Sequence, residues 1–373
     1  MSKSLNRVLL FLGIIASIVS IFFSFFNAQK YSIDFQWSPA VTFWKGLNPY
    51  DVSISPERDN YIIFSQDPNY LHALYILFYP LSLISFNFAK EIWAILNIFF
   101  GISCIWVSKK YFQLTINQLL LVSIIFFCST PFTNNIGNGQ HTLPILLSVL
   151  IFWFSNYNLS KVTSLFVIGL KYSFAPFYFI HAFVRNKMII PIVIFLYILS
   201  AFFFSYILKE NFTLLSLVKP LLVAQNKTSY GVSDIYSLVK YIFNPPFYFT
   251  IGISLLFALI IYSLVYKYDN EFHISILSIA SLLLFYHLIY DYVFLLPLLI
   301  QFIKYFDKIS RFGKIVLSTC LFYFLFFYKV LFKLNLQNHL YAKLFGTFIL
   351  LSALILLIAK YSKKKSVEIL INH

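Results

Sequence analysis

Charged residues are scarce in this chain of 373 residues. Asp, Glu, Lys and Arg together make up 11% of it, whereas a soluble domain averages about 25%. Hydrophobic residues make up 60% of the chain, and the mean hydropathy is +0.81. This composition excludes a water-soluble globular protein of ordinary design, so the sequence predicts an integral membrane protein.

Acidic residues are the scarcer charged class, with 13 against 28 basic residues and a net charge of +15. The basic residues are spread between apolar runs and are not gathered on one domain. This distribution favours cytoplasmic loops and contacts to anionic lipid headgroups, so we expect membrane lipid and no nucleic acid as a partner. A few cations remain candidates for binding an anionic substrate.

Cysteine is also rare. Cys104, Cys128 and Cys320 lie within apolar stretches and lack the spacing of metal ligands, so we interpret them as small buried hydrophobic residues. The sequence contains no Gly-rich phosphate loop after a strand and no nucleophile motif. We therefore expect no metal site and no cofactor.

Long apolar runs recur along the chain. The first, Val8 to Phe26, follows Lys3 and Arg7 and exceeds the apolar region of a usual signal peptide, so we interpret it as a retained span. At roughly 20 residues per span the chain has room for about ten to twelve transmembrane helices. We expect an all-α, polytopic bundle that forms one membrane domain over residues 1–373. Further apolar runs occupy roughly residues 71–88, 91–108, 117–133, 141–156, 162–183, 188–208, 247–266, 272–290, 291–304, 315–332 and 340–359.

Proline interrupts several of these runs, at Pro131, Pro144, Pro176 and Pro297. Broken backbone at membrane depth is tolerated only where protein or a water-filled cavity satisfies the freed polar groups. The middle of the protein is therefore expected to enclose a cavity.

Two connections are long, residues 27–70 and 209–246. The first holds five of the 13 acidic residues and follows a span with a basic flank, so it is expected outside the cytoplasm. Its aromatic stretch at residues 35–44 predicts short interfacial helices. We expect a multi-pass protein of the cell membrane with both termini in the cytoplasm. One conflict remains, because Lys109 and Lys110 fall outside if residues 71–88 and 91–108 both cross.

Asp34 and Lys171 stand out among the ionisable residues. Asp34 follows the first span near the outer interface, where it could be a reactive carboxylate or the N-cap of the next short helix. Lys171 lies in the interior of the run 162–183. A lysine at membrane depth is by default a functional-site hypothesis, and snorkelling of its long stem to the interface is the alternative.

Gln140 lies in a polar break between two apolar runs, next to Gly139 and His141. This segment is either a ligand-binding loop or a plain turn. His287 and Asp291 are four residues apart and would share a helix face, where they could serve a site or only bond to each other. His72 and Asp67 are weaker candidates. Together these groups suit chemistry on a lipid phosphate, and they also suit a proton-coupled transporter.

Five segments resemble those of glycosyltransferase family 87, in the same order along the chain. Asp34-Phe35 with Gly46-Leu47-Asn48-Pro49-Tyr50 resembles the opening of the family pattern. Two departures are Tyr70-Leu71-His72 where the family has Tyr-Pro-Pro, and Tyr172 after Lys171 where it has Pro. The later segments are Gly139-Gln140, Gly169-Leu170-Lys171 with Pro176, Gln225-Asn226-Lys227-Thr228-Ser229 and the stretch from His287 to Pro297.

The resemblance implies a GT-C-type membrane enzyme that moves a hexose, by family analogy mannose, from a polyprenyl-phosphate donor to a hydroxyl of a glycan or glycolipid acceptor. Transfer would occur on the outer face of the membrane, with inversion of the anomeric configuration and without a metal or cofactor. Asp34 would be the general base, with Lys171 and His287 at the donor phosphate. The remaining substrate-binding residues would be Gln140, Asn226, Asp291 and Tyr50.

The rival class is a proton-coupled transporter or a lipid flippase that uses Asp34, His287 and Asp291 as a proton relay. The chain has no internal sequence repeat, and many transporter folds are built from such repeats. The missing repeat and the acidic first outer loop favour the enzyme.

Overall fold

The computed structural model describes residues 3–57, 59–60, 62–64, 66–225, 233–266, 271–336 and 339–371. These residues form helices joined by turns and loops, and no strand occurs among them. They divide into two compact units. Unit 1 comprises Met1–Ala16, Ser108–Pro131 and Ser229–His373, and unit 2 comprises Ser17–Val107 and Phe132–Thr228. Helix α1 (Lys3–Lys30) contributes to both units.

Several helices are long and apolar enough to cross a membrane, which confirms a helical membrane protein. Within the described ranges, length and composition identify six such helices. A bent pair, α6 (Ile116–Phe127) and α7 (Thr130–Gly137), with 55° between its halves, would make a seventh span. The predicted count of ten to twelve spans is therefore not confirmed. The six spans are Val8–Lys30, Phe86–Phe112, Ile189–Leu208, Tyr248–Val265, Arg311–Leu331 and Leu340–Lys360.

The apolar run at residues 71–88 does not form one helix. It divides into α3 (His72–Leu77) and α4 (Tyr79–Ser82), because Pro80 lacks the N–H that a continuous helix would need. The next helix, α5 (Phe86–Phe112), is then the only long apolar helix described between Lys30 and Lys110. If α1 and α5 both cross, the basic start of α1 and the basic end of α5 lie on the same side. The charge conflict posed by the sequence disappears.

Unit 2 is built around the first long connection, which is folded into the unit. The predicted aromatic helix is present as α2 (Trp37–Trp44), and most of its side chains are buried. Trp37 Nε1 donates to the carbonyl oxygen of Leu81 and Trp44 Nε1 to that of Tyr75, both at 2.9 Å. These bonds tie α2 to the segment of α3 and α4.

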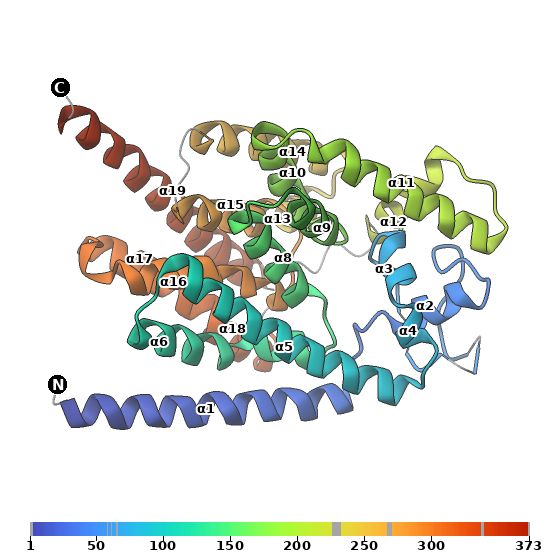
Figure 1. Cartoon of the computed structure of the whole chain (residues 1–373), viewed down its shortest axis with the longest axis horizontal. Helices are drawn as coiled ribbons and strands as arrows, with labels where there is room; N and C mark the ends of the chain where they lie inside the picture. Colours follow the sequence, from blue (N-terminus) through green and yellow to red (C-terminus); the bar gives the residue numbers. More distant parts are fainter. Residues whose placement is uncertain are drawn as a thin grey trace. The chain divides into compact units, whose positions relative to one another are not determined.

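The remaining helices of unit 2 surround this core. Helix α9 packs against α8, α10 and α11, and α3 packs against α11 (Figure 1). Their bounds are α8 (Thr142–Phe154), α9 (Asn158–Gly169), α10 (Ala175–Arg185), α11 (Ile189–Leu208) and α12 (Leu214–Gln225).

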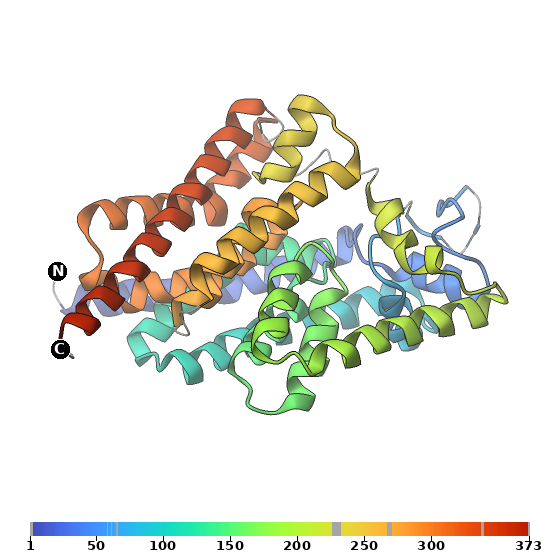
Figure 2. The ribbon, with the colours of Figure 1, turned by 90° about the horizontal axis from the view of Figure 1, so that it is seen from above.

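Unit 1 is centred on α15 (Glu271–Leu284), which is buried from His273 to its end. It packs against α13, α14, α16 and α19, while α17 also packs against α19 (Figure 2). A π-helical turn, η4 (Tyr323–Phe327), interrupts the helix between α17 and α18. The other elements of unit 1 that follow Ser229 are α13 (Ile235–Phe243), α14 (Phe247–Val265), η2 (Ile289–Leu295), α16 (Leu296–Lys304), η3 (Phe306–Lys308), α17 (Arg311–Phe322), α18 (Tyr328–Lys333) and α19 (Leu340–Ile371).

Candidate functional site

Asp34 is held in the loop between α1 and α2 by backbone hydrogen bonds to a second loop. Its N–H donates to the carbonyl oxygen of Asn138 at 3.0 Å, and the N–H of Ser32 donates to that of Gly137 at 3.0 Å. Helix α2 has Gln36 at its N-cap and no side-chain cap. Gln36, and not Asp34, is thus the N-cap residue of α2, and the catalytic role of the Asp34 carboxylate stays a prediction. Its side chain is half-buried beside the polar segment that precedes α8.

Gly139 allows the two loops to meet. Its φ is +70°, and a Cβ at this position would lie 2.6 Å from the Cβ of Phe35. The ring of Phe35 is fully buried and stacks on Trp93, with centroids 5.8 Å apart. Only glycine combines this backbone conformation with so close an approach. Two segments that the sequence singled out separately thus form one structural element.

Gln140 lies in this element and is 3% exposed. Its Oε1 accepts a hydrogen bond from the hydroxyl of Tyr70 at 3.4 Å. Tyr50 is also buried, and its hydroxyl donates to the carbonyl oxygen of Tyr70 at 2.7 Å. Tyr50 therefore supports Tyr70 from within the core. The substrate-binding role of Tyr50 stays a prediction, and Tyr50 would contribute to it indirectly, by holding Tyr70 in place.

Lys171 lies in the turn between α9 and α10. The predicted continuous helix over residues 162–183 is not found, because α9 ends at Gly169 and Pro176 stands at the start of α10. The half-buried Lys171 places its Nζ 3.4 Å from Thr142 Oγ1. The break thus brings this cation to the first turn of α8, next to His141.

An apolar groove of about 620 Å³ lies beside this turn, within unit 2. Side chains from α3, α4, α5, α8 and α9 form its walls, and most of them are Leu, Ile, Val, Phe and Pro. Only Tyr70, Trp93 and His141 bring side-chain polar atoms to the lining. Lys171 itself does not line the groove, but it follows the lining residue Leu170 and its charge acts on His141, which does line the groove.

His141 was not singled out from the sequence as a site residue. It is 2% exposed, and within the described part of the chain neither ring nitrogen has a hydrogen-bond partner. Burial, and then the charge of Lys171, lower the pKa of His141 to about 3. At neutral pH the ring is therefore uncharged and offers one N–H donor and one acceptor. Its position directly before an apolar run was the available sequence signal.

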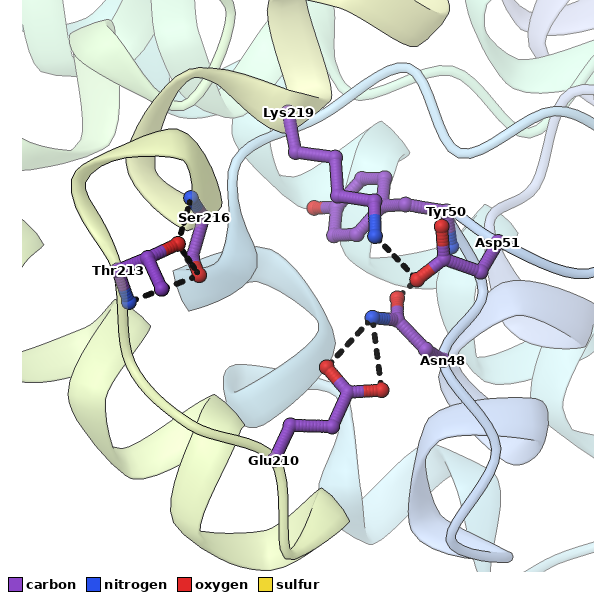
Figure 3. Close-up of polar contacts among 7 residues, drawn as sticks. All are labelled: Asn48, Tyr50, Asp51, Glu210, Thr213, Ser216 and Lys219. Atoms are coloured by element: carbon purple, nitrogen blue, oxygen red, sulfur yellow. Dashed lines mark hydrogen bonds and ion pairs between the residues drawn. The ribbon is translucent and has the colours of Figure 1, made fainter.

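The two long connections contact each other in unit 2 (Figure 3). The side-chain amide of Asn48 donates to both carboxylate oxygens of Glu210, at 3.2 and 2.9 Å, and Lys219 forms an ion pair with Asp51. Burial, and then the charge of Lys219, lower the pKa of the nearby His72 to about 4. This contact joins the Asn48-Pro49-Tyr50 segment to the residues that follow α11.

Helix α12 begins within the second of these connections. Reciprocal bonds between the backbone and side chains of Thr213 and Ser216 close its first turn, with N–H to Oγ distances of 3.2 and 3.3 Å (Figure 3). Asn226, a predicted substrate-binding residue, comes directly after α12 and lies outside the described residues.

His287 and Asp291 belong to unit 1 and form a buried pair. His287 Nδ1 lies 3.1 Å from Asp291 Oδ2, and its Nε2 lies 3.1 Å from the carbonyl oxygen of Ser281. Because a carbonyl oxygen only accepts, the contact with Ser281 requires a hydrogen on Nε2, while Nδ1 faces the Asp291 carboxyl group. The predicted common helix face is wrong, since residues 286–288 are not helical and η2 starts at Ile289. Both ring nitrogens are used within unit 1, while the predicted binding roles of the pair stay predictions.

Asp234 is a second buried carboxylate of unit 1 that the sequence did not single out. It is the N-cap of α13, where its Oδ1 accepts from the N–H of Ser237 at 2.6 Å. Its Oδ2 accepts from the N–H of His287 at 3.4 Å. Burial raises the pKa of Asp234 to about 7, while these hydrogen bonds and the charge of Lys343 act in the opposite direction. An aspartate directly before an apolar helical run was the available sequence signal.

Within the described ranges, no group of three or more His, Cys, Asp or Glu side chains could hold a metal ion. The arrangement in unit 2 instead combines a carboxylate, a cation and an uncharged imidazole near an apolar groove. No family model matches the chain, and neither a curated protein nor a solved structure matches it.

Proposed function

We propose that this protein is a membrane glycosyltransferase of GT-C type that moves a hexose from a polyprenyl-phosphate donor to an acceptor hydroxyl. The observation that carries the proposal is the apolar groove of unit 2, which the neutral imidazole of His141 lines, with the cation Lys171 close to that imidazole. A polyprenyl phosphate has the matching chemistry, because a long hydrocarbon chain ends in an anion. The donor sugar, by the family resemblance mannose, would project from the phosphate.

The phosphate end would be stabilised by Lys171 and His141. Negative charge builds up on the leaving phosphate as the bond to the sugar breaks, and a fixed cation lowers the energy of that state. Lys171 is anchored beside Thr142, with its Nζ 5.6 Å from the centroid of the Phe174 ring. The imidazole of His141 can add one N–H donor without adding charge.

Asp34 would be the general base. The acceptor oxygen attacks the anomeric carbon, and the proton of the acceptor hydroxyl passes to the Asp34 carboxylate. The bond from the anomeric carbon to the phosphate oxygen breaks, and its electron pair stays on the departing phosphate. A single displacement of this kind inverts the anomeric configuration. Backbone bonds hold the loop of Asp34 against residues 137–138, which precede Gln140 in the chain. The acceptor would be a glycan or glycolipid.

The proposed orientation places both termini in the cytoplasm and the loop that carries Asp34 outside. Lys3 and Arg7 precede the first span, and Lys109 and Lys110 end α5. If both helices cross, these four basic residues lie on one side, as the positive-inside tendency requires. The protein would be a multi-pass protein of the cell membrane.

The test is transfer by the purified full-length chain from polyprenyl-phosphate hexoses to glycan acceptors, followed by mass spectrometry of the products. Asp34→Asn is expected to lower the rate roughly 10²–10⁴-fold, as for loss of a general base. Asp51→Asn, at an exposed carboxylate of the same unit, serves as the matched control. Unchanged turnover in Asp34→Asn would refute the base assignment, and failure to bind any polyprenyl-phosphate sugar would refute the enzyme class.

The role of Lys171 has its own control. Lys171→Met is expected to lower kcat by roughly 10²–10³, the range for loss of one electrostatic contact in the transition state. Lys187→Met removes an exposed cation of the same unit and should leave kcat near that of the wild type. Equal losses in the two variants would contradict a specific role for Lys171.

A second candidate function is proton-coupled transport or lipid flipping, and the buried groups of unit 1 favour it. The ring of His287 contacts Asp291 at 3.1 Å, and its backbone N–H donates to Asp234 at 3.4 Å, so three titratable residues lie close together. In proteoliposomes with a pH gradient, a transporter would move substrate without covalent change and Asp291→Asn would uncouple it. A glycosyltransferase would instead form product without a gradient.

A further inference from the structure

Unit 1 contains a cavity of its own, with a volume of about 280 Å³. It lies among α15, α16, the start of α17 and the last apolar turns of α19. Leu298, Leu317 and Leu357 are among the apolar side chains of its wall. Nothing in the proposed transfer reaction uses this cavity.

The cavity lies at the level where the membrane interface is expected. The apolar span in α17 begins at Arg311, and the apolar span in α19 ends at Lys360. A Cβ at Gly313 would lie 3.4 Å from Leu356 Cδ2, so the start of one span is packed against the end of the other. Basic residues commonly mark such ends, where their stems lie along hydrocarbon and their charges reach the headgroups.

The polar side of the cavity is positive. Lys308 and Lys360 line it and are exposed, while no acidic residue of the described chain lines it. Ser310, the N-cap of α17, also contributes to the lining and accepts from the N–H of Gly313 at 3.2 Å. The start of a helix carries a partial positive charge that favours anions. Glu271 is nearby but is bound by Lys304 at 2.9 Å.

A buried amide oxygen in the wall has no hydrogen-bond partner among the described residues. Gln301 lines the cavity and is 2% exposed. Its Nε2 donates to the carbonyl oxygen of Glu271, which fixes the amide orientation, and its Oε1 accepts no bond. Such an unpaired buried acceptor is unfavourable unless a ligand supplies a donor. A headgroup hydroxyl is a donor of the required kind.

We propose that this cavity binds one anionic phospholipid with a hydroxyl-bearing headgroup. Its phosphate lies between Lys308, Lys360 and the first turn of α17. Part of an acyl chain occupies the apolar wall, and the headgroup hydroxyl donates to Gln301 Oε1. This site is separate from the groove of unit 2 and does not depend on the glycosyltransferase proposal.

Binding of a fluorescent phosphatidylglycerol to the purified full-length chain tests the proposal, with phosphatidylcholine as the zwitterionic comparison. The double variant Lys308→Gln/Lys360→Gln is expected to weaken phosphatidylglycerol binding roughly tenfold or more, since each basic residue near a lipid surface contributes about fivefold. The control Lys329→Gln/Lys333→Gln removes the same charge from α18, outside the cavity lining and away from the first turn of α17, and should change binding little.

A third variant tests the cavity itself. Ala359 lines the cavity and is exposed, so Ala359→Trp can fill the opening without repacking the core. It is expected to abolish phosphatidylglycerol binding while thermal stability stays close to that of the wild type. Three results would overturn the proposal: equal binding of phosphatidylcholine, equal weakening by the control double variant, or displacement of the lipid by inorganic phosphate alone.

Discussion

Gly139→Ala tests whether the loop of Asp34 and the loop of Gln140 form one element. The substitution adds a methyl group whose carbon would lie 2.6 Å from Phe35 Cβ, 3.3 Å from its Cα and 3.4 Å from its N. Two of these neighbours are backbone atoms, so rotation of a side chain cannot relieve the overlap. The whole loop that carries Asp34 would have to move.

A second glycine of the same unit separates the two costs of the substitution. Gly46 also has positive φ, +80°, but a Cβ there would meet nothing within 4 Å. Gly46→Ala should therefore cost only the backbone strain, about 1–2 kcal/mol. Gly139→Ala should add the cost of overpacking, about 1–3 kcal/mol. The expected difference between the two variants is about 1–3 kcal/mol, with Gly139→Ala the less stable.

Denaturant unfolding in detergent, followed by tryptophan fluorescence, measures this difference if unfolding is reversible, and thermal inactivation half-lives measure it if not. Transfer activity provides a second readout, because only Gly139→Ala should displace Asp34 and lower turnover. Equal destabilisation by the two substitutions would show that Phe35 does not press on Gly139. The pairing of the two loops would then be refuted.

Three further predictions concern single contacts. Folding takes up a proton at Asp234 between about pH 4 and pH 7, because the pKa of Asp234 is raised to about 7 in the folded protein. The stabilisation of the folded state by this protonated carboxyl group is fully present below about pH 4 and is lost as the pH rises through 7. Asp234→Asn should flatten this fall, by at most about 4 kcal/mol, in unfolding measured from pH 4 to 8. Tyr50→Phe removes the hydrogen bond from the Tyr50 hydroxyl to the carbonyl of Tyr70 and should lower the unfolding free energy by about 0.5–1.5 kcal/mol in denaturant titration. Lys219→Met breaks a partly exposed ion pair with Asp51 and should cost less than about 1 kcal/mol, a loss that shrinks further in high salt.

The class of the protein follows from its amino-acid composition and hydropathy pattern alone. Few charges and long apolar runs require a membrane, and hydrocarbon requires that each spanning segment satisfy its own backbone hydrogen bonds. The aromatic stretch at residues 35–44 likewise predicted a helix that the structure has as α2. These are local properties, because composition and short-range pattern decide them.

The span count could not be predicted in the same way. Hydropathy treats an apolar run as one segment, whereas Pro80 and Pro176 divide two such runs into short helices. Each proline lacks the donor that a continuous helix needs at that position. Pro176 was recognised from the sequence as an interruption and Pro80 was not, and the hydropathy pattern did not show which interruptions end a helix.

Which polar groups meet depends on how distant segments pack against one another. Asp34 and Asn138 are about a hundred residues apart in sequence, and a backbone hydrogen bond joins them at 3.0 Å. His141 and Lys171 share one end of α8 because α9 breaks before Lys171. The sequence marked Asp34, Gln140 and Lys171 by their residue type, since polar groups are conspicuous in an apolar chain. His141 and Asp234 carry only a weak local signal, a polar residue directly before an apolar run, because their importance lies in burial, and burial is produced by packing between segments distant in the chain.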